Sequence, residues 1–269
     1  MLNDVTFGQF YPSDSFVHKM DPRFKLVIMF AYIIILFVIN SLIGYVLAGL
    51  FVILAIAASK VPVKLLAKNL KPLWFVFIFM FLLNMFFTRT GNVILSFWVI
   101  SITDDGIIKA VVMLVRLVML IFFTGLLTLT TSPISLTVGI ESLFGPLKKI
   151  KFPVHEMAMM MTIALRFIPT LIEETDKIMK AQMARGASFD TGNLMQKVKS
   201  MIPLFIPLFV SAFRRADELA LAMTARCYRG GEGRTRMTPL KIGRGDCVAA
   251  AVSFVFCTAM IVFNFVNIF

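Results

Sequence analysis

Charged, cysteine and histidine residues are scarce in this 269-residue chain, and each scarcity argues against a class of protein. Charged side chains make up 16% of the sequence, against about 25% in soluble domains, so an ordinary soluble protein is not expected. The three cysteines, Cys227, Cys247 and Cys257, are odd in number and show no C-x-x-C spacing, so neither a disulfide framework nor a zinc site is predicted. Because His18 and His155 are the only histidines, we expect no metal site.

The sequence motifs of nucleotide, metal and hydrolase chemistry are also missing. No G-x-x-x-x-G-K-[S/T] phosphate loop occurs, and Gly231-Glu232-Gly233 lacks the third glycine of a dinucleotide-binding fingerprint. His155-Glu156 begins like the zinc-protease motif H-E-x-x-H, but Met159 occupies the second histidine position. No G-x-S-x-G nucleophile motif occurs. We therefore expect a chain that is not an enzyme and that binds no cofactor itself.

Apolar residues dominate the composition and lie in long runs. They make up 59% of the chain, including 28 Phe and 18 Met, and the mean hydropathy is +0.87. A transmembrane helix needs about 20 mostly apolar residues. The fold class predicted is an all-α integral membrane protein, with about five spans at Phe24 to Asn40, Leu42 to Ala58, Leu73 to Phe87, Ile107 to Leu129 and Cys247 to Val266.

One further apolar stretch, Asn92 to Ile102, lies between the third and fourth predicted spans. It is too short to cross a bilayer. We expect an interfacial or re-entrant helix there in preference to a sixth span.

The charged residues between the spans predict the orientation of the chain in the cell membrane. Cytoplasmic loops retain Lys and Arg. Lys19, Arg23 and Lys25 thus place the N-terminus in the cytoplasm, and the cluster from Lys60 to Lys71 places the loop after the second span there too. With five spans, Phe269 is expected outside.

The segment 131–245 is then a long cytoplasmic insertion between a membrane domain, 1–130, and a C-terminal transmembrane helix, 246–269. It holds 17 of the 27 cations and 9 of the 15 acids, so the basic charge gathers on one side of the membrane. Nucleic-acid binding is not expected, because Tyr228 is the only Tyr or Trp of the insertion and no groove-reading motif occurs.

Two helical arms are predicted within this insertion. His155 to Arg185 carries an apolar stripe at helical spacing, with charged residues opposite and Pro169 near the middle. A second arm, from about Asn193 to Arg229, has an apolar first half that we expect Pro203 and Pro207 to break. The arms form a pair of long amphipathic helices that are too polar to cross the membrane.

Both arms end in an alanine, an arginine and a small residue, followed by helix-breaking residues. The endings are Ala184-Arg185-Gly186 and Ala225-Arg226-Cys227. Small neighbours leave each guanidinium accessible to a partner, and its planar fork binds carboxylates bidentately. An arginine near a helix C-terminus also complements the helix dipole, which is the alternative interpretation for a single tip. Two matched tips favour a docking role.

Two other features are candidates for partner contacts. Arg116 lies near the middle of the fourth predicted span, where a cation costs at least about 2.5–3.5 kcal/mol. It is expected either to meet a partner or an internal carboxylate, or to extend its side chain to the interface. Met157, Met160 and Met161 are either core residues or an adaptable contact surface.

The chain resembles the transmembrane T component of energy-coupling factor (ECF) transporters, which are ABC importers of vitamins and trace nutrients. The resemblance covers nearly the whole chain and rests on three motifs in order. They are an N-terminal signature from Gly8-Gln9-Phe10-Tyr11-Pro12 through Ser15 and His18 to Asp21-Pro22-Arg23 and Lys25, the first Ala-Arg-Gly tip, and Ala222-Met223-Thr224-Ala225-Arg226-Cys227-Tyr228. Thr224 and Cys227 depart from the family's usual Glu and Gly.

This resemblance implies a scaffold that couples ATP hydrolysis to uptake. Each tip, Ala184 to Gly186 and Ala225 to Cys227, is expected to dock into one of two cytoplasmic ATPases. A membrane-embedded, substrate-binding S component is the second kind of partner, with Met157, Met160, Met161 and Arg116 as candidate contacts. ATP is then bound by the partner subunits alone. The alternative function is a secondary transporter or channel-type permease, which the scarcity of acids within the spans disfavours.

Overall fold

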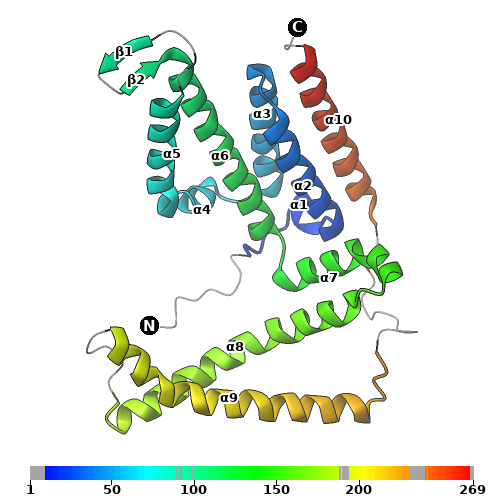
Figure 1. Cartoon of the computed structure of the whole chain (residues 1–269). Helices are drawn as coiled ribbons and strands as arrows, with labels where there is room; N and C mark the ends of the chain where they lie inside the picture. Colours follow the sequence, from blue (N-terminus) through cyan, green and yellow to red (C-terminus); the bar gives the residue numbers. More distant parts are fainter. Residues whose placement is uncertain are drawn as a thin grey trace. The chain divides into compact units, whose positions relative to one another are not determined.

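The computed structural model describes residues 10–88, 90, 93–97, 100–187, 189, 194–230, 240 and 242–266. The chain forms two compact units. The membrane unit comprises Gly8–Gly139 and Leu240–Phe269, and the arm unit contains Ile140–Pro239. In chain order the elements are α1 (Phe16–Lys19), α2 (Pro22–Val38), α3 (Leu42–Ser59), α4 (Val63–Lys68), the 3₁₀ helix η1 (Lys71–Leu73), α5 (Trp74–Phe87), β1 (Val93–Phe97), β2 (Ile100–Thr103), α6 (Asp104–Thr130), α7 (Pro133–Leu143), the 3₁₀ helix η2 (Gly145–Ile150), α8 (Val154–Ala184), α9 (Leu194–Ala225) and α10 (Arg244–Val266) (Figure 1).

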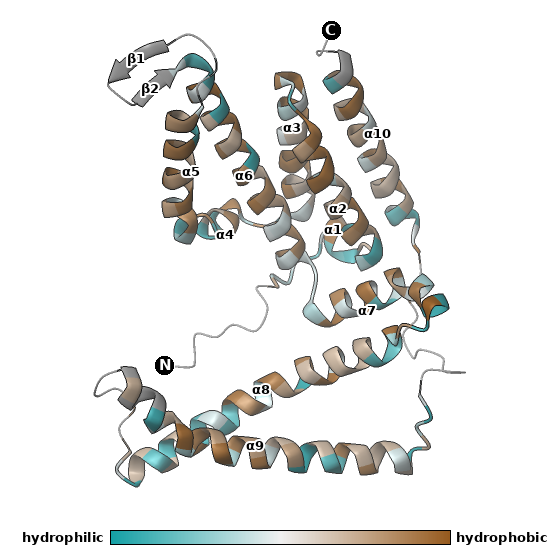
Figure 2. Cartoon of the chain, in the orientation of Figure 1, coloured by the Kyte–Doolittle hydropathy of each residue, from teal (hydrophilic) through white to brown (hydrophobic). Residues whose placement is uncertain are grey.

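The helices of the membrane unit confirm the predicted fold class. Among the described residues, four helical stretches are long and apolar enough to cross a bilayer: Leu42–Ser59, Val63–Phe87, Asp104–Thr130 and Arg244–Asn264. The third predicted span therefore draws on flanking residues of α4 and η1. The first coincides with α2, an apolar helix of 17 residues that packs between α6 and α10. Figure 2 shows the apolar colouring of these helices.

The prediction of a helix over Asn92 to Ile102 is wrong. This stretch contains the antiparallel hairpin of β1 and β2, in which Ser96 pairs with Ser101 and Phe97 with Ile100. The β-branched residues that crowd the segment favour extended backbone over helix. The hairpin joins α5 to α6, and the Thr103 hydroxyl that ends it donates to the Thr88 carbonyl at 3.0 Å.

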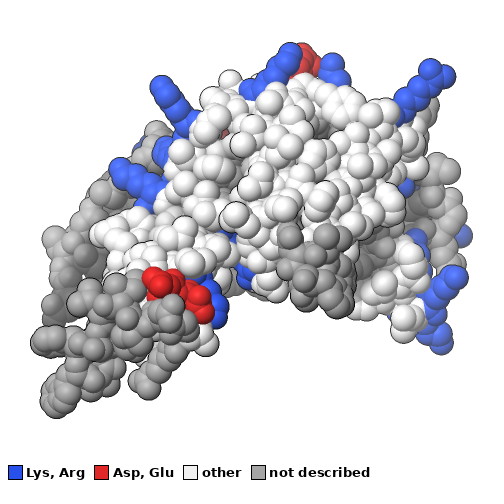
Figure 3. Space-filling model, turned by 90° about the horizontal axis from the view of Figure 1, so that it is seen from above, with Lys and Arg blue, Asp and Glu red and all other residues white. Residues whose placement is uncertain are grey.

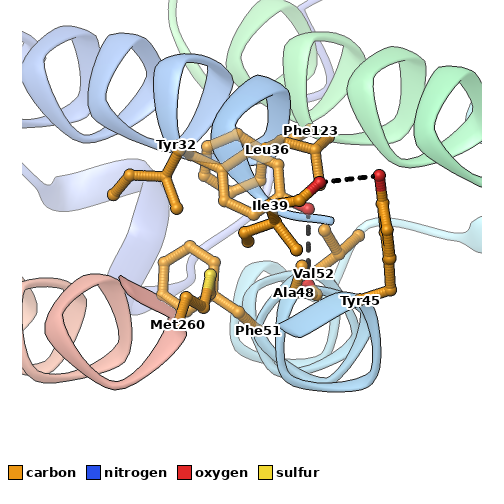
Figure 4. Packing of buried hydrophobic residues seen from close by; sticks show 10 residues of the cluster. Tyr32, Leu36, Ile39, Tyr45, Ala48, Phe51, Val52, Phe123 and Met260 are labelled. Carbon is orange, nitrogen blue, oxygen red and sulfur yellow. Dashed lines mark hydrogen bonds between the residues drawn. The ribbon is translucent and has the colours of Figure 1, made fainter. Parts of the chain in front are cut away.

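The core of the membrane unit is an aromatic and aliphatic cluster where α2, α3, α6 and α10 meet (Figure 4). The Tyr32 ring lies 4.4 Å from that of Phe123 and 5.7 Å from that of Phe51, centroid to centroid. Burying the Tyr32 phenol requires a hydrogen-bond partner, and its hydroxyl donates to the Ala48 carbonyl at 3.3 Å. This cluster fixes α2 against α3.

The outer sides of the same helices are apolar as well. Phe30, Ile34 and Phe37 on α2 are each more than half exposed, and so are Trp74 and Phe75 on α5. In water such contiguous apolar surface is unfavourable, whereas lipid covers it without penalty. Figure 3 views the molecule from above, and the middle of that face carries few charged side chains.

Candidate functional site

The first tip is a helix end closed by a left-handed glycine. At the C-terminus of α8, the Gly186 N–H donates to the Met183 carbonyl and the Ala187 N–H to the Gln182 carbonyl, both at 3.0 Å. This is a Schellman cap, which requires a positive φ at its turning residue; Gly186 has φ 91°. Arg185 precedes the turn and is exposed, so its guanidinium is accessible.

The second tip repeats this geometry at the end of α9. The Cys227 N–H donates to the Thr224 carbonyl at 2.9 Å and the Tyr228 N–H to the Met223 carbonyl at 3.0 Å. Cys227 takes the left-handed position with φ 56°. Arg226 is exposed directly before the turn, as Arg185 is in the first tip. The two predicted tips are thus the same structure, with cysteine in place of glycine in the second.

Cys227→Gly is expected to stabilise the second tip by about 1 kcal/mol, because a residue with a Cβ atom is strained in the left-handed region and glycine is not. Cys227→Val should have the opposite effect, since β-branching increases the strain. Hydrogen exchange of the amides of residues 222–226 measures both, with Cys247→Gly as a control outside the tip. Equal protection in the Gly and Val variants would contradict the assignment of the cap.

Both arms are single helices, which corrects the prediction for the second. α9 runs without interruption through Pro203 and Pro207, as α8 runs through Pro169. Each proline removes one backbone hydrogen bond, and the helix persists because the neighbouring residues on both sides keep theirs and Leu204 is buried. The rest of the apolar half of α9 remains on the surface of the arm unit.

The two arms are joined by a polar contact in the C-terminal half of each helix. Arg215 of α9 donates to the Glu174 carboxylate of α8 at 2.6 Å, and the Ser211 hydroxyl donates to the other oxygen of the same carboxylate. The Glu174 and Arg215 side chains are 21% and 31% exposed, so the pair is only partly screened by water. We name the group of Glu174, Ser211 and Arg215 the arm pin.

The arm pin lies at the same distance along each helix from its tip. Arg185 follows Glu174 by eleven residues, and Arg226 follows Arg215 by eleven residues. At 1.5 Å per residue, each tip is about 16 Å beyond the pin. α8 and α9 run in different directions from this contact, so their tips lie at opposite ends of the arm pair (Figure 1). The arrangement presents two equivalent, separated arginines.

The arm pin was not predicted from the sequence, where Glu174 counted only as a residue of the polar side of the first arm. The available signal was a pair of opposite charges on the polar sides of two helices. Arg214, next to Arg215, is exposed instead. The two neighbouring arginines therefore have different surroundings.

Exposed apolar residues form a stripe along the first half of α9. Ile202, Ile206, Phe209 and Phe213 follow one another by four, three and four residues, which places them on one face of the helix. All four are at least half exposed. We name this face the α9 stripe. On α8, the predicted contact residues Met157, Met160 and Met161 are likewise exposed.

Arg116 lies in the membrane unit near the midpoint of α6. It donates to the Ile39 carbonyl at 2.9 Å and contacts the Tyr45 hydroxyl. Its guanidinium carbon is 5.8 Å from the centroid of the Phe37 ring, within cation–π range. Ile39 follows the last residue of α2, so the cation meets the negative end of that helix dipole. Among the residues that the structure describes, the internal partners of Arg116 are thus uncharged oxygens and the rings of Phe37 and Tyr45, where a carboxylate was one expectation.

Apolar spanning helices joined to a pair of pinned, amphipathic helices with matched arginine tips define a multi-pass membrane protein. The family model CbiQ, described as cobalt transport protein, matches residues 13–237. The chain belongs to this family, and it is also similar to the energy-coupling factor transporter transmembrane proteins.

Several relatives resemble it over nearly their whole length. The energy-coupling factor transporter transmembrane protein EcfT of Ruminiclostridium cellulolyticum is 53% identical over 266 residues, 99% of each chain. The EcfT protein of Clostridium kluyveri is 53% identical over 256 residues, 95% of each chain. That of Bacillus subtilis is 46% identical over 263 residues, 98% of this chain and 99% of its own. These relatives favour an ECF transporter component over a secondary transporter or channel.

Proposed function

We propose that the chain is the transmembrane scaffold and energy-coupling subunit of an ECF-type importer of vitamins or other micronutrients. It links two cytoplasmic ATP-binding-cassette ATPases to one membrane-embedded S component that binds the nutrient. The chain itself catalyses nothing and binds no cofactor, and ATP is bound by the partner ATPases.

The pair of matched tips carries this proposal. Each tip offers an exposed arginine at a Schellman-capped helix end, and both lie eleven residues from the arm pin. Two contact points of the same structure, held apart by one pair of helices, can bind two ATPase subunits that share the same fold. Because a guanidinium pairs best with carboxylates, each ATPase groove is expected to carry acidic residues.

The orientation follows from the tips and from the charge distribution. ATPases that use cytoplasmic ATP meet the tips only if the arm unit lies in the cytoplasm. The excess of Lys and Arg in 131–245 agrees with this side, as does the basic region from Lys19 to Lys25. The N-terminus is then cytoplasmic and the C-terminus external.

The α9 stripe is the proposed contact for the S component. An S component is itself an apolar membrane protein, so its surface is expected to pack against exposed Ile and Phe side chains. A charged helix face would find no complementary groups on such a surface. The exposed methionines of α8 supply adaptable surface beside it. Large apolar side chains on a partner-facing helix also explain why so much of α9 is uncovered in the isolated chain.

Ile206→Glu and Phe209→Glu are each expected to reduce retention of the S component by roughly 10- to 100-fold, because each replaces about 1.5–3 kcal/mol of apolar burial with a charge. Both ATPases should still copurify, since the tips are unchanged. The measurement is the mass-identified subunit composition of complexes purified through a tag on this chain.

Leu221→Glu is the matched control for these variants. Leu221 is 70% exposed on the same helix but lies beyond the α9 stripe. It should keep the S component. Retention of the S component by the Ile206→Glu and Phe209→Glu complexes would place its binding surface elsewhere.

A further inference from the structure

A buried cation at the start of α2 fastens the end of α6. Lys25 is 6% exposed, and its ammonium group donates to the Thr130 carbonyl at 3.0 Å and to the Thr131 hydroxyl at 3.2 Å. Its third hydrogen bond goes to the His18 carbonyl at 3.3 Å. All three donors of the ammonium are therefore used. Thr130 and Thr131 are the last residues of α6 and its cap, where helix carbonyls lack partners within the helix.

A buried carboxylate fastens the start of α10 to the same turn. Asp246 is 5% exposed, and one of its oxygens accepts the Asp21 N–H at 2.8 Å. The other oxygen accepts the Gly243 N–H at 2.8 Å, which closes the turn before α10. Asp21 is buried too, and its own carboxylate caps α2 by accepting the Arg23 N–H at 2.9 Å.

The same turn also contacts α7. A Cβ atom on Gly139 would lie 3.1 Å from Cβ of Pro22 and 3.4 Å from Cδ1 of Leu26. The first distance is tighter than most contacts of real Cβ atoms, so a larger residue at this position would require Pro22 to shift by a few tenths of an ångström. The backbone of α7 therefore lies directly against Pro22.

These contacts coincide with the two places where the chain passes between the units. The chain leaves the membrane unit through the end of α6 and the first part of α7, up to Gly139, and it returns from Leu240. Both passages are held by Asp21, Pro22 and Lys25. We name the group of Asp21, Lys25, Thr130, Thr131 and Asp246, with its Pro22–Gly139 contact, the passage clamp.

Stability alone does not explain two carboxylates and an ammonium in the passage clamp. Buried charges lose hydration that their mutual attraction seldom repays in full, and apolar replacements of similar volume are often at least as stable. What such a group does provide is a fixed register between the segments that it joins. Here the joined segments are the links to the arm unit.

We propose that the passage clamp is a positioning site for energy coupling: it fixes both chain passages to α2, so that a movement of the arm unit is passed to the membrane unit instead of being absorbed at the passages. This inference rests on the proposed function. Lys25 acts through the passages it holds and touches neither ATP nor the transported nutrient.

The test separates a coupling role from a folding role with two variants of the complete complex. Lys25→Met removes the buried cation that faces Asp21 and Asp246 and leaves only Arg23, whose Nε lies 3.9 Å from Asp21 Oδ1, so this complex should be less stable. Lys25→Met combined with Asp246→Asn removes one of the buried negative charges and keeps one of the two backbone hydrogen bonds that residue 246 accepts, so it should restore assembly with both ATPases and the S component. The ammonium hydrogen bonds to Thr130 and Thr131 remain absent. Uptake per ATP hydrolysed, in vesicles, should therefore fall by about tenfold or more in the double variant, while ATP hydrolysis continues.

Two control variants accompany this measurement. Lys109→Met removes an exposed lysine of α6 that donates to Thr90, and it should leave uptake per ATP unchanged. Lys25→Arg keeps a cation with several donors and should retain most of the coupling. Parent-like uptake per ATP in the double variant would overturn the proposal. Failure of the double variant to assemble, while both controls assemble, would also overturn it, because the passage clamp would then be a folding element.

Measurements on the parent complex and on the double variant test the proposed function and the passage clamp separately. If the parent chain retains neither ATPases nor an S component, the proposed function is wrong. If the parent complex transports and the double variant transports equally well, only the passage clamp is wrong.

Discussion

Arg185→Glu combined with Arg226→Glu is expected to abolish both the binding of ATPases and ATP-driven uptake. Truncating one partner of a buried interfacial charge pair costs about 2–5 kcal/mol, or roughly 30-fold to several thousand-fold in affinity, and arginine is frequent among interface hot spots. Reversal of the charge adds repulsion to that loss. Each single change should weaken assembly, and the two together should leave no contact point.

The structure supplies a sharp control for the tip variants. Arg214→Glu changes an exposed cation of α9 without touching a tip or the arm pin, so assembly and uptake should stay close to those of the parent. Arg215 does not serve this purpose, because it binds Glu174. An acid-to-base change in the ATPase groove should restore part of the binding to a Glu-tipped chain. A double variant that assembles and transports like the parent would refute docking at the tips.

Glu174→Arg is expected to weaken the binding of both ATPases together, although Glu174 touches neither tip. The variant places two arginines and a serine against one another at the arm pin. Loss of this mostly buried pair costs roughly 1–3 kcal/mol, and because both arms depend on it, affinity should fall by about 5- to 150-fold at each tip. The measurement is the affinity of each purified ATPase for the chain, determined separately.

The charge swap Glu174→Arg with Arg215→Glu should recover most of this loss, because it recreates the ion pair in reverse. Glu173→Arg is the matched control. Glu173 is the residue next to Glu174, but its carboxylate is exposed and takes no part in the arm pin. If Glu174→Arg affected only the ATPase at one tip, or if the swap gave no recovery, the arm pin would not be a shared support.

The features that the sequence predicted well are those set by local patterns. Apolar runs placed the spans, and a stripe at helical spacing placed the first arm, which ends at Ala184, one residue before the predicted end at Arg185. The tips were recognisable because a left-handed cap needs glycine or a tolerated substitute directly after the helix, and both endings show this pattern. The role of these residues in docking remains a proposal.

The features that the sequence did not predict depend on contacts between distant residues. Glu174 and Arg215 are 41 residues apart, Lys25 and Thr130 are 105 apart, and Asp21 and Asp246 are 225 apart. No periodicity of one segment encodes such a pairing. The hairpin was missed for a different reason: a short apolar run fits strand and helix equally, and β-branched content should have decided it. The prolines of α9 were overestimated as helix breakers, since packing outweighs propensity in a long helix.

The number of ATPase subunits bound per chain, measured by native mass spectrometry of the purified complex, tests the central claim most directly. The account predicts two ATPases on the parent chain, one on Arg185→Glu, one on Arg226→Glu and none on the double variant, with the Arg214→Glu control retaining two. A double variant that retains both ATPases would contradict it, and the two arms would then have to be interpreted as structural supports of the membrane helices.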